Sequence, residues 1–194
     1  MPITEIAGSI LGAVAGLLLI RRSIWSYPFG IAMVGLYAIV FFQARLYSDA
    51  ALQLFFLAVQ VYGWINWAAN RARQGTVIVR RMSGREVALW VGIVAAATLA
   101  DYALLAGHTR DAAPLLDALI TAFSIAAQTL LAIRRLESWI AWIVVDLIGV
   151  ALYLSQQLYT VAGVYLIFLS LSVAGLIAWR QAWDRQQAIS SATA

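Results

Sequence analysis

Two stretches of the chain, residues 46–67 and 158–179, decide the fold. They read LYSDAALQLFFLAVQVYGWINW and LYTVAGVYLIFLSLSVAGLIAW, and they align without a gap. They are identical at 10 of 22 positions, including L-Y at the start and G-x-I-x-W at the end. Each stretch is long and apolar enough to be a membrane-spanning helix. The same kind of helix therefore occurs twice, which predicts a duplicated unit; the alternative is chance similarity between apolar helices.

The composition indicates a membrane protein. Of the 194 residues, 63% are hydrophobic and only 11% are charged, whereas a soluble domain of this size has more polar surface. There is no cysteine, which excludes disulfides, a thiol nucleophile and a cysteine-based metal site. The one histidine, His108, is expected in a loop. We therefore expect no catalytic metal and no cofactor.

Seven apolar runs predict an all-α integral membrane protein with seven transmembrane helices. Each run is close to the length of about 20 residues that crosses a bilayer. Inside lipid the backbone must satisfy its own hydrogen bonds, so these runs are expected to be helical. The runs are residues 3–20, 24–44, 48–69, 87–107, 115–133, 138–157 and 159–179.

The arginines predict the orientation. All 13 basic residues are arginines, and all but Arg45 and Arg110 fall on one side of the predicted membrane. By the positive-inside rule that side is cytoplasmic, which puts the N-terminus outside and the C-terminus inside. The arginines of the loop at 71–85 are therefore interpreted as a topology signal, and we expect no nucleic-acid partner despite the net charge of +4.

The repeat extends upstream of the two matching helices. Residues 17–22 (LLLIRR) resemble 130–135 (LLAIRR), and Trp25 and Trp139, three and four residues further on, are interpreted as equivalent. Four spans separate equivalent helices, so the two triplets are predicted to be parallel and the fourth helix to be a linker. This is the SWEET-like 3+1+3 plan, in which substrate binds between the units. The expected parts are a bundle at 1–70, a cytoplasmic loop with linker helix at 71–110, a second bundle at 111–185 and a tail at 186–194.

Polar residues recur on one face of three predicted helices. A polar group in hydrocarbon costs several kcal/mol unless it finds a partner, so such stripes predict a shared cavity. Helical spacing aligns the members of each stripe. The stripes are Gln53, Gln60 and Trp67; Asp117, Thr121, Ser124 and Gln128; and Trp139, Trp142, Asp146, Gly149 and Tyr153.

The repeat duplicates the framework but not these polar groups. An asymmetric small molecule on a pseudo-twofold axis requires such a difference. The alternative for Gln60, Gln128 and Asp146 is hydrogen bonding between helices, and for Trp139 and Trp142 an interfacial belt. The mismatched pairs are Gln53 with Tyr165, Gln60 with Ser172, Asn66 with Ala178, and Asp146 near Ala32.

Several motifs together resemble the PnuC family of vitamin transporters over residues 5–183. They are YPFG at 27–30, YGWINW at 62–67 and ESWIAW at 137–142, followed by Asp146. The resemblance implies facilitated diffusion of a nucleoside-like vitamin, usually nicotinamide riboside, with thiamine or riboflavin in some members. It also implies trapping by a cytoplasmic kinase, and homotrimers are known in the family. The implied substrate-binding residues are Gln53, Gln60, Asn66, Gln128, Trp139, Trp142 and Asp146.

The leading hypothesis is a uniporter for nicotinamide riboside in the bacterial inner membrane. Thiamine or riboflavin is the alternative substrate. A membrane-embedded enzyme would have only Asp101, Asp117 and Asp146 for acid–base chemistry, with no nearby histidine. A receptor-like or assembly subunit is a third hypothesis. The chain contains no G-x-x-x-x-G-K-[ST] motif, so ATP-driven pumping by this chain is not expected.

Overall fold

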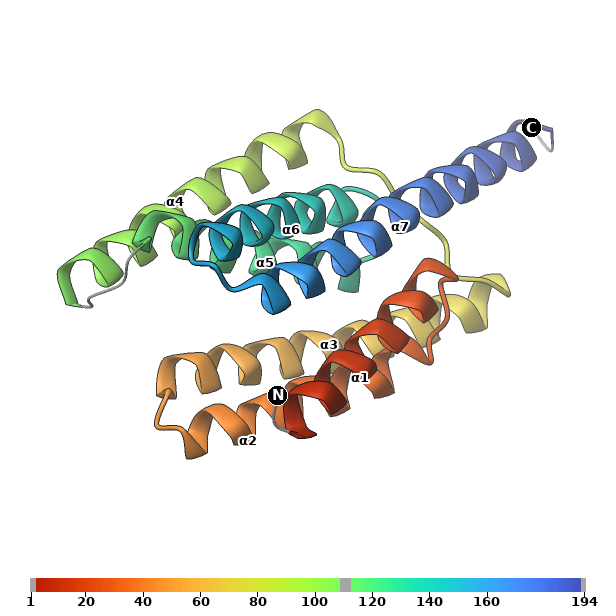
Figure 1. Ribbon diagram of the computed structural model, residues 1–194. Helices are drawn as coiled ribbons and strands as arrows, with labels where there is room; N and C mark the ends of the chain where they lie inside the picture. Colours follow the sequence, from red (N-terminus) through yellow and green to blue (C-terminus); the bar gives the residue numbers. More distant parts are fainter. Residues whose placement is uncertain (1–2, 109–112, 193–194) are drawn as a thin grey trace.

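The computed structural model describes residues 3–108 and 113–192, and within these ranges the fold consists of seven helices (Figure 1). The predicted all-helical fold is confirmed: no strand occurs in the described ranges, only an isolated parallel bridge between Arg80 and Arg135. Five helices, α2 and α4–α7, are long and apolar enough to cross a membrane. The helices are α1 Ile3–Ile20, α2 Ser26–Gln43, α3 Tyr47–Gln74, α4 Gly84–His108, α5 Pro114–Ala132, α6 Ser138–Ser155 and α7 Tyr159–Ala192.

Two helices extend well beyond the ends of their apolar runs. α3 continues from residue 69 to Gln74 and ends at Gly75, which adopts a left-handed conformation (φ 71°) that suits glycine. α7 continues from residue 179 to Ala192. Both extensions are rich in Arg, Gln and Ala, which are good helix formers. Hydropathy therefore marks the membrane span and not the end of the helix.

The helices form two bundles. α1, α2 and α3 pack together, as do α5, α6 and α7, and the bundles meet where α1 contacts α7 and α3 contacts α5. Within the described residues, α4 contacts α5 and no other helix. Figure 1 shows α1–α3 below, α5–α7 above them, and α4 on the outer side of the second bundle. The first and last triplets are thus two separate packing units with one helix between them.

The backbone repeats at a spacing of 112 residues. α2 and α6 begin at Ser26 and Ser138, and α3 and α7 begin at Tyr47 and Tyr159, so both pairs keep that spacing. Non-glycine residues with positive φ follow the same rule, since they are Arg22 and Arg134, and Arg45 and Gln157. The internal repeat is therefore present in the structure, turns included.

This spacing corrects the upstream part of the sequence alignment. Tyr27 is the structural counterpart of Trp139, where the sequence alignment had Trp25. Val34 is the counterpart of Asp146, where the alignment had Ala32. The pairing of 17–22 with 130–135 was wrong by one residue. Apolar helices tolerate such a shift because neighbouring positions carry similar residues, whereas the turns fix the register.

Two buried tryptophans join the bundles symmetrically. Trp67 Nε1 donates a hydrogen bond of 3.1 Å to the Leu131 carbonyl, and Trp179 Nε1 donates one of 3.0 Å to the Leu19 carbonyl. Both tryptophans are 0% exposed. Donors and acceptors are each 112 residues apart, so each bundle contributes one indole and one carbonyl. These bonds close the interface at the arginine-rich end of the molecule.

The connection from α3 to α4, residues 75–83, covers the same end, and we call it the strap. Its Val77 and Val79 side chains are buried in the core cluster. The aromatic members of that cluster are Tyr27, Trp67, Trp139 and Trp179. An apolar plug therefore lies between the arginine-rich surface and the interior of the molecule.

Hydrogen bonds attach the strap to both bundles. On the first bundle, Arg22 Nη1 donates to the Val77 carbonyl at 3.1 Å. On the second, the Arg80 backbone N–H donates to the Arg134 carbonyl at 2.9 Å, and the Leu136 N–H donates to the Arg80 carbonyl at 2.9 Å. Any separation of the bundles at this end must break one of the two attachments.

Candidate binding site

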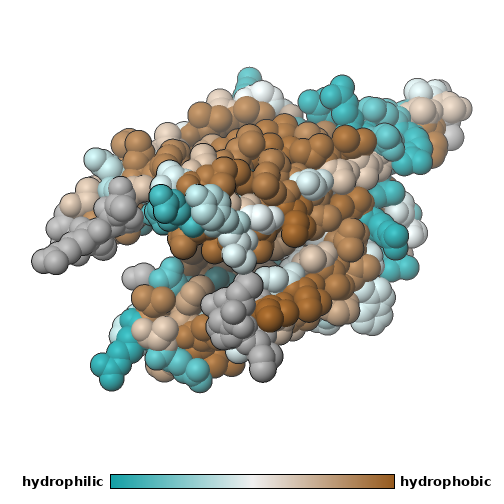
Figure 2. Space-filling model, viewed as in Figure 1, coloured by the Kyte–Doolittle hydropathy of each residue, from teal (hydrophilic) through white to brown (hydrophobic). Residues whose placement is uncertain are grey.

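A cavity of about 450 Å³ lies between the two bundles. It is lined by residues of every helix except α4, and its volume is in the range typical of small-molecule sites. It begins at Tyr27 and Trp139 of the core cluster. Figure 2 shows the surface hollowed between the bundles at the end away from the strap. The cavity is thus blocked at the arginine-rich end.

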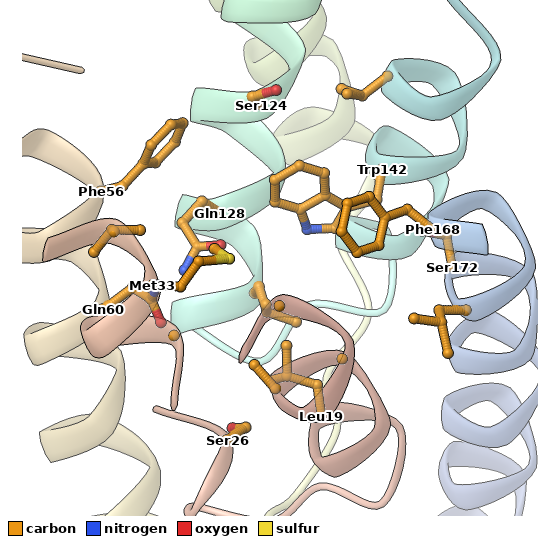
Figure 3. A pocket seen from close by; sticks show the side chains of 18 of the residues that line it. Leu19, Ser26, Met33, Phe56, Gln60, Ser124, Gln128, Trp142, Phe168 and Ser172 are labelled. Carbon is orange, nitrogen blue, oxygen red and sulfur yellow. The ribbon is translucent and has the colours of Figure 1, made fainter. Parts of the chain in front are cut away.

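Six of the seven predicted binding residues line this cavity. Gln60 and Gln128 are each 8% exposed, and Figure 3 shows them entering from α3 and α5. Trp142 enters from α6, on the side from which Phe168 of α7 also enters. The structure brings together polar and aromatic side chains that lie far apart in the sequence. The six residues are Gln53, Gln60, Gln128, Trp139, Trp142 and Asp146.

Asn66 is the predicted residue that does not line the cavity. Its Nδ2 donates a hydrogen bond of 2.8 Å to the carbonyl of Ala132, the last residue of α5. The bond lies beside the Trp67 bond and also joins α3 to α5. Asn66 is one residue before Trp67, which places it on a different face of α3 from Gln53 and Gln60. The structure thus gives Asn66 the role of an interhelical contact.

Asp146 has one hydrogen-bond donor and no basic partner among the described residues. Ser172 Oγ donates a 2.8 Å hydrogen bond to Asp146 Oδ2, and both side chains are buried. The ion pairs of the described residues, Arg81–Glu137 and Arg135–Glu86, lie elsewhere. A buried carboxylate without a counter-charge is costly, so a cationic ligand would stabilise it.

Two further cavity groups have unused hydrogen-bonding capacity. Tyr27 Oη and Trp139 Nε1 are buried, and neither has a hydrogen-bond partner in the described part of the chain. They are structural counterparts at the blocked end of the cavity. Both polar atoms are therefore buried beside the cavity without a hydrogen bond in the described structure.

Glycines make room for several cavity side chains. A Cβ atom at Gly30 would overlap the Gln60 amide, and one at Gly175 would overlap the Trp139 ring. A Cβ atom at Gly149 would likewise overlap the ring of Tyr165. Gly149 and Gly175 therefore require glycine, because an aromatic ring cannot easily move aside, whereas a Cβ atom at Gly30 would displace the flexible Gln60 amide.

Some lining residues were not selected from the sequence. Tyr165 and Ser172 line the cavity from α7, although they served only as the mismatched counterparts of Gln53 and Gln60. Ser124 was recognised in a polar stripe but not chosen. The sequence could have indicated Tyr165 and Ser172, because a site between two equivalent units is lined by the same positions of both units.

The fold and the cavity are those of a small-molecule transporter: two helical bundles in a membrane with a polar, aromatic site between them. The profile of the family described as nicotinamide mononucleotide transporter matches residues 2–181, so the chain belongs to this family, which includes the PnuC transporters. The resemblance found in the sequence is thereby confirmed. The chain is a multi-pass membrane protein.

Relatives and a solved structure agree with this assignment. The nicotinamide riboside transporter PnuC of Escherichia coli (strain K12) is 26% identical over 198 residues, covering 87% of this chain and 83% of that protein. The riboflavin/roseoflavin transporter RibM of Streptomyces davaonensis is 32% identical over 180 residues, covering 91% and 84%. The crystal structure of the vitamin B3 transporter PnuC is 27% identical, with a TM-score of 0.74, covering 95% of this chain and 84% of that one.

Proposed function

We propose that this protein carries nicotinamide riboside into the bacterial cell by facilitated diffusion across the inner membrane. The observation that carries the proposal is the buried Asp146, held by Ser172 in a cavity with no basic partner among the described residues. Nicotinamide riboside has a positively charged pyridinium ring, which would supply the missing counter-charge. The relatives from Escherichia coli and Neisseria mucosa that are named nicotinamide riboside transporters support this choice.

In the proposed complex, each part of the substrate has a partner in the cavity. The pyridinium ring stacks on Trp142, and its charge faces Asp146. The carboxamide and ribose hydroxyls hydrogen-bond to Gln60 and Gln128, which enter from different bundles. Gln53 lies further toward the open end of α3 and contacts the substrate on entry. Binding across the two bundles would let the substrate influence how they move.

The conformation described above corresponds to an outward-facing state in this proposal. By the positive-inside rule the arginine-rich end is cytoplasmic, with the N-terminus outside and the C-terminus inside. Release then requires that the Trp67 and Trp179 bonds break and that the strap withdraws Val77 and Val79. Rocking of two parallel triplets in the SWEET-like 3+1+3 manner would do this.

The division of the chain follows from that cycle. Residues 1–70 and 111–185 are the two moving bundles, residues 71–110 are the strap region with linker helix α4, and residues 186–194 are a tail. The separate packing of α1–α3 and α5–α7 supports this division. The resemblance to PnuC proteins further suggests a homotrimer, which cross-linking in native membranes would test.

Transport needs no ATP site on this chain in the proposed mechanism. A monovalent cation is drawn inward by the membrane potential, worth about 2.3 kcal/mol per 100 mV. A cytoplasmic kinase that phosphorylates the substrate would then prevent its return. Uptake in cells lacking that kinase is expected to plateau early, whereas initial binding is expected to remain normal.

Riboflavin is the second candidate substrate. RibM, named a riboflavin/roseoflavin transporter, is 32% identical to this chain, which supports a flavin as substrate. Riboflavin's ring system is neutral, however, and would leave Asp146 without a counter-charge. Thiamine, which is cationic, is the remaining alternative from the same family.

The deciding experiment is uptake into proteoliposomes. We expect saturable uptake of radiolabelled nicotinamide riboside, with weak competition by riboflavin. Asp146→Asn should weaken the binding of nicotinamide riboside about 10- to 150-fold, because the substrate loses a charged hydrogen-bonding partner that contributes about 1.5–3 kcal/mol. Asp101→Asn on α4, outside the cavity, is the matched control and should behave as wild type. Absence of saturable nicotinamide riboside uptake would refute the proposal.

A further inference from the structure

A second and larger cavity, of about 960 Å³, lies on the outside of the second bundle. It forms because α4 packs on α5 but does not contact α6 or α7. We call it the α4 groove. Its body is apolar, with Val91 and Val94 of α4 on one wall and Ile140 and Leu176 of α6 and α7 on the other. The α4 groove is separate from the cavity between the bundles, and no described residue lines both.

The strap end of the α4 groove carries charges of both signs. Arg180 and Asp184 are exposed and lie one turn apart on α7. Arg81 of the strap lies across from them and has its Nε 3.6 Å from a Glu137 carboxylate oxygen. A mouth with two guanidinium groups and two carboxylates is complementary to a ligand that carries both a negative and a positive charge.

Two aromatic residues accompany these charges. Trp90 of α4 and Trp183 of α7 both line the α4 groove and are partly exposed. Tryptophan prefers the headgroup level of a bilayer, where the ring meets the apolar region and its N–H meets water. The mouth of the α4 groove therefore has the composition of a membrane interface, and its body has the composition of the hydrocarbon region.

The length of the α4 groove matches one leaflet. Its lining along α4 extends from Gly84 to Leu99. At a rise of about 1.5 Å per residue this is about 22 Å, and half of a bilayer with headgroups is also about 20–22 Å. A single lipid standing upright would place its headgroup at the charged mouth and its chains beside Val91 and Val94.

We propose that the α4 groove binds one zwitterionic aminophospholipid of the phosphatidylethanolamine class. Arg81 and Arg180 hold its phosphate, Asp184 holds its ammonium group, and one acyl chain fills the apolar body. A purely anionic lipid would find Asp184 and Glu137 repulsive, and it would leave Asp184 without a counter-charge. Since Gly84 directly follows the strap, the bound lipid also supports the beginning of α4.

The first test fills the body of the α4 groove. Ala95 lines it, whereas the neighbouring Ala96 does not, and both are exposed. The full chain is purified in mild detergent from membranes containing phosphatidylethanolamine and phosphatidylglycerol, and retained lipid is measured by native mass spectrometry. Ala95→Trp should abolish the retained lipid, and Ala96→Trp should keep it. Equal retention in the two variants would overturn the proposal.

The second test concerns the headgroup. Asp184→Asn should reduce the retained ratio of phosphatidylethanolamine to phosphatidylglycerol about two- to fivefold, because only the first lipid carries the ammonium group, and an exposed charge contact contributes up to about 1 kcal/mol. Asp49→Asn, in the first turn of α3, is the control and should leave the ratio unchanged. An unchanged ratio in Asp184→Asn, or preference of the wild type for phosphatidylglycerol, would overturn the proposal. So would a change of oligomeric state in Ala95→Trp with lipid retained, because a second copy would then occupy the α4 groove.

Discussion

Replacing Trp179 by Phe should open the arginine-rich end of the molecule more often. The change removes the 3.0 Å hydrogen bond from the indole Nε1 to the Leu19 carbonyl and leaves an aromatic ring in place. The carbonyl still accepts the 2.8 Å hydrogen bond from the Arg22 backbone N–H, so no buried acceptor is left unpaired. The bond contributes about 0.6–2 kcal/mol between membrane helices, and the packing lost with the smaller ring acts in the same direction. This corresponds to an increase of about 3- to 30-fold in the ratio of open to closed molecules.

The absence of cysteine makes this change measurable. Cysteines introduced at Arg73 on α3 and Gln187 on α7, both exposed, would be the only sites for spin labels. Electron paramagnetic resonance distance measurements should show a larger long-distance population in Trp179→Phe than in the parent. Trp67→Phe should give a similar increase, since Trp67 makes the equivalent bond to Leu131.

The matched control is Trp64→Phe on α3. Trp64 is 37% exposed and makes no bond between the bundles in the described structure, so its replacement removes the same atoms without affecting the closure. If Trp179→Phe and Trp64→Phe gave the same distance distribution, the indole bonds would not hold this end closed. A shift toward shorter distances would contradict the reasoning in the same way.

Two further predictions concern the cavity and the strap. Gly30→Ala should lower substrate affinity about tenfold or more, a loss of about 1.4 kcal/mol, because the new Cβ atom displaces the Gln60 amide. The affinity is measured by calorimetric titration. Gly35→Ala is the control and should leave the affinity unchanged, because a Cβ atom there meets no atom within 4 Å. Val79→Ala should destabilise the protein by about 1.5–2.5 kcal/mol through the loss of buried methyl groups, seen as a lower Tm in detergent. Val87→Ala, at a position 40% exposed, should lower Tm far less, and equal shifts would show that the strap is not part of the packed core.

The sequence predicts the helices well because lipid leaves the backbone few choices. Seven apolar runs correspond to seven helices in the described residues, and the match of 46–67 with 158–179 recurs in the structure at the same spacing. The sequence does not show where α7 ends, because its polar extension to Ala192 forms helix outside the apolar run. It also contains no signal that Val77 and Val79 enter the core, since short apolar residues in a connection are common.

The register upstream could not be obtained from apolar similarity alone. LLLIRR and LLAIRR match best with a shift of one residue, yet Arg22 and Arg134 are the residues with positive φ. A left-handed turn is a stricter marker of equivalence than a leucine, because few residues can occupy it without strain. Once the turns are aligned, Val34 rather than Ala32 is the counterpart of Asp146.

The polar residues that line the cavity could largely be predicted from the sequence, but the rotation of each helix against its neighbours could not. Helical spacing correctly places Gln60, Gln128 and Asp146 each on a polar helix face that lines the cavity, since side chains seven or eleven residues apart on one helix share a face. Spacing cannot decide whether a polar residue such as Asn66 faces the cavity or a neighbouring carbonyl. That depends on the rotation of α3 against α5, which is set by packing between elements far apart in the chain.

Equivalent positions in this protein separate into two kinds. Trp67 and Trp179 are identical and make equivalent bonds at the closed end, so the two bundles contribute equally to that contact. Gln60 and Ser172 differ, and Ser172 uses its hydroxyl to hold Asp146, whose own counterpart is a valine. Closure requires two similar units, whereas recognition of an asymmetric molecule requires different ones. The two requirements act on different turns of the same helices, seven residues apart on α3 and on α7, so one duplicated framework can satisfy both.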